Sequence, residues 1–276
     1  MKIAHLILAH CDSQQLGRLI DRLQNPDAFF FIHIDKKTEL DSFMFLKDKK
    51  QVYFVKDRVN VGWGAYSIIE ATINGFKEIL SSDLCVDYVN LLSGADYPLK
   101  KASQIHQFFE EHSGQNFMEY LSVYDEWTEA IPRLTEYHLT NYAFPGKYVA
   151  QKWLNRLTPT RKMPNNLIPV GKSQWFSISV EAVKFILNYL EKYPEVVRFF
   201  KLTWAPDEII FQTILYNSEF KDRLVNNNLR YIDWSAGKAS PEILTEADLP
   251  TLKASNALFA RKFSMSKHPE IMDLLD

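Results

Sequence analysis

The first 115 residues alternate short apolar runs with amphipathic segments, and this alternation narrows the possible folds more than any other feature. We predict buried strands at Lys2–Ala9, Ala28–Ile34 and Val52–Val55, and a fourth within the stretch Val86–Leu99. Amphipathic stretches between them, such as Ile68–Leu80, predict helices. Strands that alternate with helices are typical of parallel sheets. The sequence therefore predicts an α/β fold with a mostly parallel central sheet flanked by helices.

The stretch Val86–Leu99, VDYVNLLSGADYPL, ends abruptly in small residues, a glycine, Asp96 and a proline. His10 and Asp35 follow the first two predicted strands in a similar way. Because open α/β sheets bind ligands beyond the carboxyl ends of their strands, these polar side chains predict the wall of a ligand crevice. The alternative for Asp96 is an ordinary turn, in which the carboxylate bonds to nearby backbone.

The chain changes character near residue 115, which is the best internal boundary. Beyond it, residues 125–172 form the least regular segment, and such a segment serves as a lid or a binding surface, or is partly disordered. Residues 249–275 predict helices or turns around the motif LFARKF. The regular elements predicted in this half are strands at Phe117–Val123, Ser173–Ser179 and Leu229–Trp234, a helix over Val180–Tyr193, and a helix from Pro206 to Tyr216.

The composition excludes several classes of protein. The formal net charge is −2 and the isoelectric point is near 6.4, whereas a nucleic-acid-binding protein needs a strongly basic face. Cys11 and Cys85 have no CxxC partner, which argues against a zinc site and fits a reducing compartment. The apolar N-terminal run is too short to span a bilayer and lacks a small-residue cleavage site. We therefore expect a cytoplasmic protein.

The common catalytic motifs are absent from the sequence. It contains no GxSxG, GxxxxGK[ST], GxGxxG or HExxH motif. It also lacks the Asp-x-Asp pair with which sugar-nucleotide enzymes usually hold a divalent metal between diphosphate oxygens. We therefore expect neither a metal site nor a cofactor.

Two constellations remain as candidates for chemistry. Glu208 stands at a predicted helix start, where a carboxylate could act as a general base in a crevice; the alternative is an acidic residue favoured there by the helix dipole. Arg261 and Lys262 could neutralise a departing diphosphate, and the alternative is a surface cation pair at a helix end. Lys238 could assist them, although a lone loop lysine is usually solvated.

These motifs together resemble the core-2/I-branching β-1,6-N-acetylglucosaminyltransferases and peptide O-xylosyltransferases, which form glycosyltransferase family 14. The resemblance covers roughly residues 2–265 and carries little of segment 125–172. The order of SGADYPL, PDE and LFARKF is its most specific part. The motifs are LILAH (6–10), HIDKK (33–37), VGWGAYSIIEA (61–71), NLLSGADYPL (90–99), SQWFSIS (173–179), APDEIIFQT (205–213), YIDW (231–234) and LFARKF (258–263).

The resemblance implies a GT-A-like nucleotide-sugar-binding fold, here a single catalytic domain over 1–276. Residues 1–115 would be the nucleotide-binding half, and residues 116–276 the acceptor-binding and catalytic half. It implies an inverting, metal-independent transfer of GlcNAc or xylose from a UDP-sugar to an acceptor hydroxyl. By the same resemblance, Glu208 is the catalytic base and Lys262 contacts the donor diphosphate, with Arg261 beside it.

The resemblance also suggests the remaining site residues. His10, Asp35 and Asp96 are expected on the nucleotide and donor side. A second family cation would fall at Ala239, and Lys238 beside it is a possible substitute. The resemblance does not carry over the acceptor-binding residues, for which our own hypothesis is Trp234, Arg133 and Tyr137.

The chain resembles the short microbial members, because animal members carry a membrane anchor, a stem and several disulfides. The expected acceptor is a glycan or a lipid-linked saccharide, at the inner face of the cell membrane. The basic segment 147–162 either contacts that membrane peripherally or forms a solvated face. Two alternatives stay open: another UDP-hexose donor, or a non-catalytic sugar- or nucleotide-binding protein on the same fold.

Overall fold

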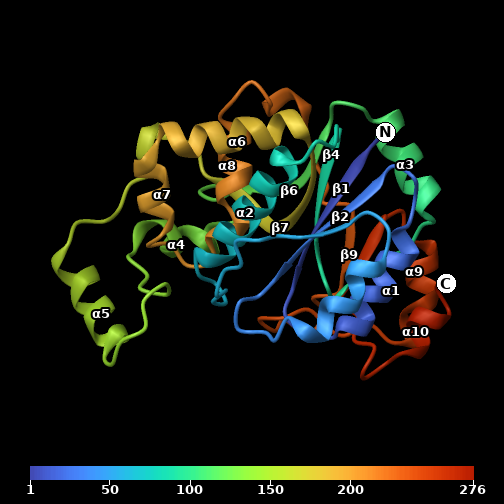
Figure 1. Cartoon of the computed structure of the whole chain (residues 1–276). Coiled ribbons are helices and arrows are strands. Elements are labelled where there is room, and N and C mark those ends of the chain that lie inside the picture. Colours follow the sequence, from blue (N-terminus) through green and yellow to red (C-terminus); the bar gives the residue numbers. More distant parts are fainter.

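A computed structural model describes all 276 residues and has a seven-stranded central sheet, with the strand order β3-β2-β1-β4-β7-β6-β8 (Figure 1). Strands β3, β2, β1 and β4 are parallel to one another, β7 is antiparallel to both β4 and β6, and β8 is parallel to β6. The predicted α/β fold with a mostly parallel sheet is confirmed. The strands are β1 Ile3–Ala9, β2 Ala28–Ile34, β3 Val52–Phe54, β4 Tyr88–Ser93, β5 Asp96–Pro98, β6 Asn116–Ser122, β7 Val170–Ser179, β8 Leu224–Asn226, β9 Arg230–Ile232 and β10 Phe259–Arg261.

Helices cover both faces of this sheet, which explains why β1 is apolar at every position except His5. Its alternate side chains Ala4 and Leu6 pack into one core with α2, whereas Ile3 and Ile7 pack into a second core with α1. A strand buried on both faces has no solvent-facing positions. The α-helices are α1 Ser13–Leu23, α2 Ser67–Ser81, α3 Ala102–Glu111, α4 Ile131–Thr135, α5 Lys147–Leu157, α6 Val180–Lys192, α7 Pro194–Phe200, α8 Ile210–Tyr216, α9 Leu249–Ala254 and α10 Glu270–Asp273.

Short 3₁₀ helices complete the chain, at Asp41–Asp48, Thr128–Ala130, Pro164–Asn166, Pro206–Glu208, Lys221–Arg223 and Glu246–Asp248. The helix predicted from Pro206 is therefore a 3₁₀ turn that leads into α8. None of the helices is long and apolar enough to cross a bilayer.

A second, three-stranded sheet, β5-β10-β9, corrects our prediction for the C-terminal region. We expected helices or turns around LFARKF, but Phe259–Arg261 is a strand that pairs antiparallel with β5 and parallel with β9. Leu229–Trp234 is therefore not the last strand, and its extended part is only β9. The helices α9 and α10 confirm the rest of that prediction. It was wrong for Phe259–Arg261 because three residues are too few to show a periodicity, and the partner strands supply the pairing.

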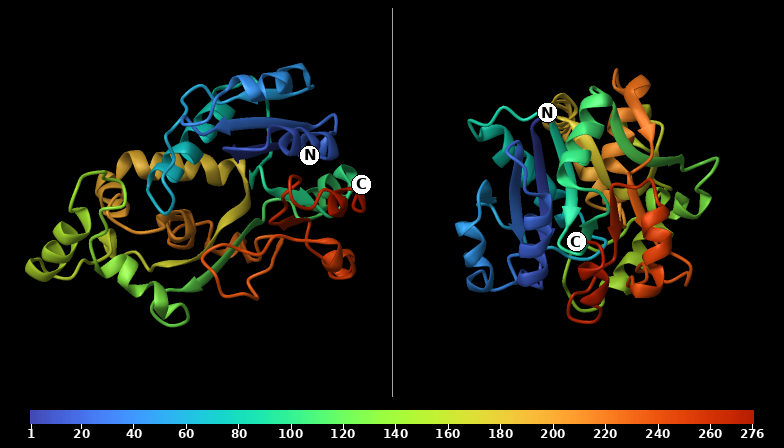
Figure 2. Two further views of the ribbon diagram at one scale, coloured as in Figure 1. Left: turned by 90° about the horizontal axis from the view of Figure 1, so that it is seen from below. Right: turned by 90° about the vertical axis from the view of Figure 1, so that its right-hand side faces the viewer.

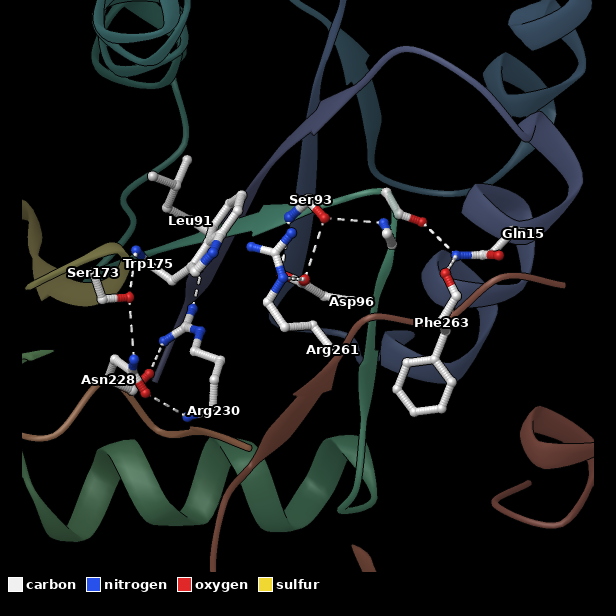
Figure 3. Close-up of polar contacts among 12 residues, drawn as sticks. Gln15, Leu91, Ser93, Asp96, Ser173, Trp175, Asn228, Arg230, Arg261 and Phe263 are labelled. Carbon is white, nitrogen blue, oxygen red and sulfur yellow. Dashed lines mark hydrogen bonds and ion pairs between the residues drawn. The ribbon is translucent and has the colours of Figure 1, made fainter. Parts of the chain in front are cut away.

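Arg230 of β9 ties the two sheets together (Figure 3). Its Nη2 donates to the carbonyl oxygens of Leu91 on β4 at 2.9 Å and Phe176 on β7 at 3.1 Å. Burial lowers the pKa of this guanidinium to about 9. The cation therefore acts as a buried strut that holds β9, and through it β10, against the central sheet.

Segment 125–172 is more ordered than a lid without regular structure. It contains α4 and α5, and it extends away from the sheet so that α5 lies at the far end of the molecule (Figures 1 and 2). We refer to residues 137–161 as the arm. The division of the chain at residue 115 stays a prediction, since strands from both halves share the central sheet.

Candidate functional site

The carboxyl ends of β1 and β2 lie together, as the parallel arrangement requires. The backbone N–H of Asp35 donates to the carbonyl of Ala9, and the Thr38 hydroxyl donates to the carbonyl of His10 at 2.8 Å. The Asp35 carboxylate is 6% exposed and accepts from the backbone N–H of Lys37 at 2.9 Å. His10 is exposed. Both predicted residues therefore stand at one edge of the sheet, with His10 open to solvent and Asp35 largely committed to its own turn.

Asp96 begins β5 and has no exposed surface (Figure 3). Its carboxylate accepts from the Ser93 backbone N–H at 2.9 Å, as the turn alternative anticipated, and it also lies 3.4 Å from Nε of Arg261 on β10. Because Asp96 is fully buried, it does not line a crevice directly. Its partner Arg261 is the partly exposed member of the pair.

Arg261 is held on two sides. Its guanidinium faces Asp96 and stacks on the Trp175 ring, 4.2 Å from the ring centroid, and 14% of the side chain remains exposed. Burial lowers the pKa of this guanidinium, and the charge of Asp96 opposes the change. The alternative of a surface cation pair at a helix end is therefore wrong for Arg261, which is a largely buried strand residue.

Lys262 follows β10 and is half-buried. Burial raises the pKa of the Cys11 thiol, and the positive charge of Lys262 opposes that rise, so Lys262 lies near the carboxyl end of β1. Lys238 lies in an exposed loop that runs beside Lys262, because the Lys262 backbone N–H donates to the carbonyl of Glu242 at 3.4 Å. The Nζ of Lys238 is 2.8 Å from Oε1 of the same glutamate. The structure thus brings Arg261 and Lys262 to the strand ends, whereas Lys238 is paired with a carboxylate.

Gln15 of α1 closes this part of the site and was not among the predicted residues (Figure 3). Its Nε2 donates to the carbonyl oxygens of Gly94 at 2.9 Å and Phe263 at 3.3 Å, and its Oε1 accepts from the backbone N–H of Met265 at 2.7 Å. The side chain is 2% exposed. Gln15 thus joins the glycine turn to the segment after Lys262. Its only sequence signal was a polar residue on the inner face of an amphipathic helix.

Glu208 ends the 3₁₀ turn before α8 and forms an ion pair with Arg133 of α4. Its Oε2 lies 2.5 Å from Nη1 of Arg133, and 31% of the Glu208 side chain is exposed. The Arg133 guanidinium stacks between the rings of Trp127 and Trp204, at 4.7 and 4.4 Å from their centroids. The predicted base and one predicted acceptor residue thus meet beside a cluster of aromatic rings, which we call the aromatic cluster, and its tryptophans were not predicted.

Trp63, in the motif VGWGAYS, also belongs to the aromatic cluster. Trp63 is 71% exposed, and its ring packs edge-on against Trp204 with centroids 5.7 Å apart. Gly64 has φ 65°, and a Cβ there would lie 2.8 Å from the Trp204 indole nitrogen. Glycine at this turn therefore lets the two tryptophans meet.

Further carboxylates surround Glu208. Burial raises the pKa of Asp207, and the negative charge of Glu208 raises it further. Burial also raises the pKa of Glu119 on β6; Lys172 opposes this rise and Glu208 adds to it. A cluster of carboxylates with raised pKa values beside a partly exposed glutamate is typical of sites where protons are transferred.

Strand β7 brings this cluster close to the sheet through a glycine and a bulge. A Cβ at Gly171 would lie 2.1 Å from the Glu208 carbonyl oxygen, so only glycine allows the turn to pack this closely. The pairing of β6 with β7 shifts between Met118 and Tyr120, which leaves residues 173–175 of β7 opposite Glu119. Bulges of this kind redirect side chains, here Trp175 toward Arg261.

We expect Gly171→Ala to destabilise the protein by roughly 2–3 kcal/mol, because the methyl group would overlap backbone that has no space to move. Gly114→Ala is the contrasting variant: its φ is 84° but no atom lies within 4 Å, so only the backbone conformation is strained, at about 1 kcal/mol. Urea unfolding measures both free energies. Equal, small losses would show that close approach at Gly171 does not matter.

The other two predicted acceptor residues are not joined to Glu208 by any contact. Tyr137 stacks on Arg161 at 5.2 Å, in the stem of the arm. Trp234 is 51% exposed in the loop after β9. The side chains also include no group of three or more His, Cys, Asp or Glu that could hold a metal ion. The expectation that the protein works without a metal stays a prediction.

Two curated proteins that are similar to this chain are named as xylosyltransferases. "Xylosyltransferase" from Ciona intestinalis is 23% identical over 306 residues, covering 100% of this chain and 34% of that protein. "Xylosyltransferase 1" from Homo sapiens is 24% identical over 308 residues, covering 100% of this chain and 30% of that protein. The chain therefore spans about a third of the length of these curated relatives.

Two solved structures are distantly similar. Mouse xyloside xylosyltransferase 1 has a TM-score of 0.42 and 10% identity, covering 94% of this chain and 97% of that one. Core-mannan synthase A from Aspergillus fumigatus has a TM-score of 0.42 and 9% identity, covering 81% and 72%.

The decisive comparison is with models of whole families. The model described as "Core-2/I-Branching enzyme" matches residues 3–253, which include the glycine turn with Asp96, the PDE turn with Glu208 and β9, and which end before LFARKF. A match over most of the chain confirms the predicted resemblance. The chain belongs to the Core-2/I-branching enzyme family, glycosyltransferase family 14.

Proposed function

We propose that this chain transfers xylose or GlcNAc from a UDP-sugar to a hydroxyl of a glycan or lipid-linked saccharide, with inversion at the anomeric carbon. The observation that carries the proposal is the Glu208–Arg133 ion pair, whose arginine lies between two tryptophan rings. Aromatic faces suit the apolar faces of sugar rings. The names of the curated relatives favour xylose as the first donor to test.

The proposed chemistry is a single displacement. The acceptor oxygen attacks the anomeric carbon from the face opposite UDP, and the bond from that carbon to the diphosphate oxygen breaks as the new bond forms. Glu208 takes the hydroxyl proton, and UDP leaves with the bonding electrons. Arg133, fixed by two aromatic rings, would orient the carboxylate.

The donor diphosphate would lie against Arg261 and Lys262. Asp96 and Trp175 orient the Arg261 guanidinium, which leaves the edge away from Asp96 for a ligand. Lys262 near the end of β1 is placed to meet an anion that enters over the strand ends, next to His10 and Asp35. Preorganised cations of this kind stabilise the charge that develops on a leaving diphosphate.

If these two cations replace a metal, transfer should survive an excess of EDTA with less than about a twofold change in rate. Dialysed enzyme is assayed for UDP release with EDTA, with Mn²⁺ and with neither. Complete loss in EDTA that Mn²⁺ restores would contradict the metal-independent mechanism.

A donor screen tests the proposed function as a whole. UDP release and product analysis are followed with UDP-xylose, UDP-GlcNAc, UDP-glucose and UDP-galactose, each with saccharide acceptors, and UDP binding is measured by calorimetry. We expect transfer from UDP-xylose or UDP-GlcNAc. Transfer only from another UDP-hexose would correct the donor, and UDP binding without transfer or donor hydrolysis would instead favour a non-catalytic binding protein.

A further inference from the structure

The arm is fixed to the body of the protein at its stem, while its tip extends outward. Arg161 is 8% exposed, and its guanidinium donates to the carbonyl oxygens of Glu136 and Leu202, both at 2.7 Å, and also to that of Phe199. These bonds join the two ends of the arm to each other, and join Arg161 to the last turn of α7 and the residues after it. Helix α5 is thus held in a defined position away from the sheet (Figures 1 and 2).

Helix α5 turns its polar side toward the protein and its apolar side outward. Gln151 Oε1 accepts from the Leu139 N–H at 2.9 Å, and Asn155 Oδ1 accepts from the Tyr137 N–H at 2.7 Å. At about 100° per residue, Trp153 lies on the side opposite these two amides. The exposed apolar residues of that outer side are Val149 (63% exposed), Trp153 (54%) and Leu157 (76%). This is the reverse of an ordinary surface helix, whose apolar face meets the core.

The outer face of α5 is bordered by positive charge only. Lys152 and Arg156, one turn apart, are exposed beside Val149 and Trp153. No Asp or Glu occurs between Glu136 and Glu181, whereas that interval holds six Lys and Arg residues. In a protein with a net charge of −2, the arm is therefore a local island of positive charge around an apolar stripe.

We propose that the outer face of α5 docks onto an anionic lipid surface, with Val149, Trp153 and Leu157 entering the headgroup region and Lys152 and Arg156 binding lipid phosphates. An exposed apolar stripe that contains tryptophan and is flanked by cations is typical of helices that lie in the plane of a membrane interface. A second copy of this chain fits less well. In a symmetric contact the same patch meets itself, which would bring Lys152 and Arg156 against like charges with no acidic partner nearby.

The position of the arm connects this surface with the site. The arm follows α4, which carries Arg133. A docked α5 would therefore hold Arg133 and the aromatic cluster near the lipid surface. That arrangement suits an acceptor whose growing end lies close to a membrane. This benefit rests on the proposed function, whereas lipid binding itself is measured without donor or acceptor.

Vesicle co-sedimentation tests the proposal with the full chain. Phosphatidylcholine vesicles with and without phosphatidylglycerol are compared at low and high salt, for wild type, V149S/W153S/L157S and K152E/R156E. K184E/K192E on α6 carries the same charge change on other exposed lysines and serves as the control. We expect wild type and control to bind only the anionic vesicles, less at high salt, and both α5 variants to bind at least about tenfold more weakly.

Three results would overturn the proposal: no binding to anionic vesicles, equal binding to neutral ones, or equal losses in K152E/R156E and in the control. Dimerisation that V149S/W153S/L157S abolishes, without vesicle binding, would assign the face to a second copy instead. Circular dichroism checks that the variants fold, as expected for side chains on the exposed surface. UDP release with a soluble acceptor is measured in parallel, so that failure of lipid docking and failure of the transferase proposal remain distinguishable.

Discussion

Glu208→Gln is expected to lower kcat for sugar transfer by about 10²- to 10⁴-fold while UDP binding is kept. Glutamine has the size of glutamate and can still accept a hydrogen bond from Arg133. The packing of Arg133 against the aromatic cluster should therefore be kept. Its amide, however, cannot take the proton from an acceptor hydroxyl. Steady-state UDP release measures the rate, and calorimetry with UDP measures the binding.

Glu219→Gln is the matched control for this experiment, because Glu219 is exposed and lies in the turn after α8. It should transfer sugar at the wild-type rate. If Glu208→Gln were as active as this control, Glu208 would not be the base. Glu119, with its raised pKa and its position near Glu208, would then be the next carboxylate to replace.

Lys262→Met is expected to reduce kcat/KM for the UDP-sugar by about 10²-fold or more, because it removes a cation from the place where the diphosphate charge develops. Methionine keeps much of the apolar stem, so the strand pairing of β10 should persist. In contrast to Glu208→Gln, this variant should also bind UDP more weakly, since the diphosphate of UDP needs the same cation.

Lys267→Met is the control for Lys262→Met, since Lys267 is exposed five residues further along the same segment. A loss of transfer with unchanged UDP affinity would place Lys262 away from the diphosphate. Raising the salt concentration should weaken UDP binding to wild type more than to Lys262→Met, because ions screen the charge that this variant lacks.

The longer strands of the first half were predictable because each is a mostly apolar run. We predicted Ala28–Ile34 with its observed bounds, and the helix over Ile68–Leu80 differs from α2 by one residue at each end. In these elements burial on one or both faces selects the residue types directly. Glu208 at a helix start was also visible, because a Pro-Asp-Glu sequence marks such a start by itself.

The partners of the charged site residues could not be predicted in the same way. Arg261 resembled a surface cation because the short motif around it mixes apolar and charged residues. The pairing of β10 with β5 places it opposite Asp96. The tryptophans around Arg133 come from separate turns of the chain. Pairings between distant segments leave no periodic trace in either segment.

The sequence by itself determined the α/β alternation, the edge of the sheet where His10 and Asp35 stand, and the membership of a family. Periodicity and burial act over a few residues, so they can be recognised from the order of residues alone. Only the tertiary structure decided that Asp96 pairs with Arg261, that Glu208 pairs with an arginine held between two tryptophans, and that α5 faces outward with its apolar side. Each of these depends on how distant segments pack, where a few ångströms of space, as at Gly171, settle which side chains meet.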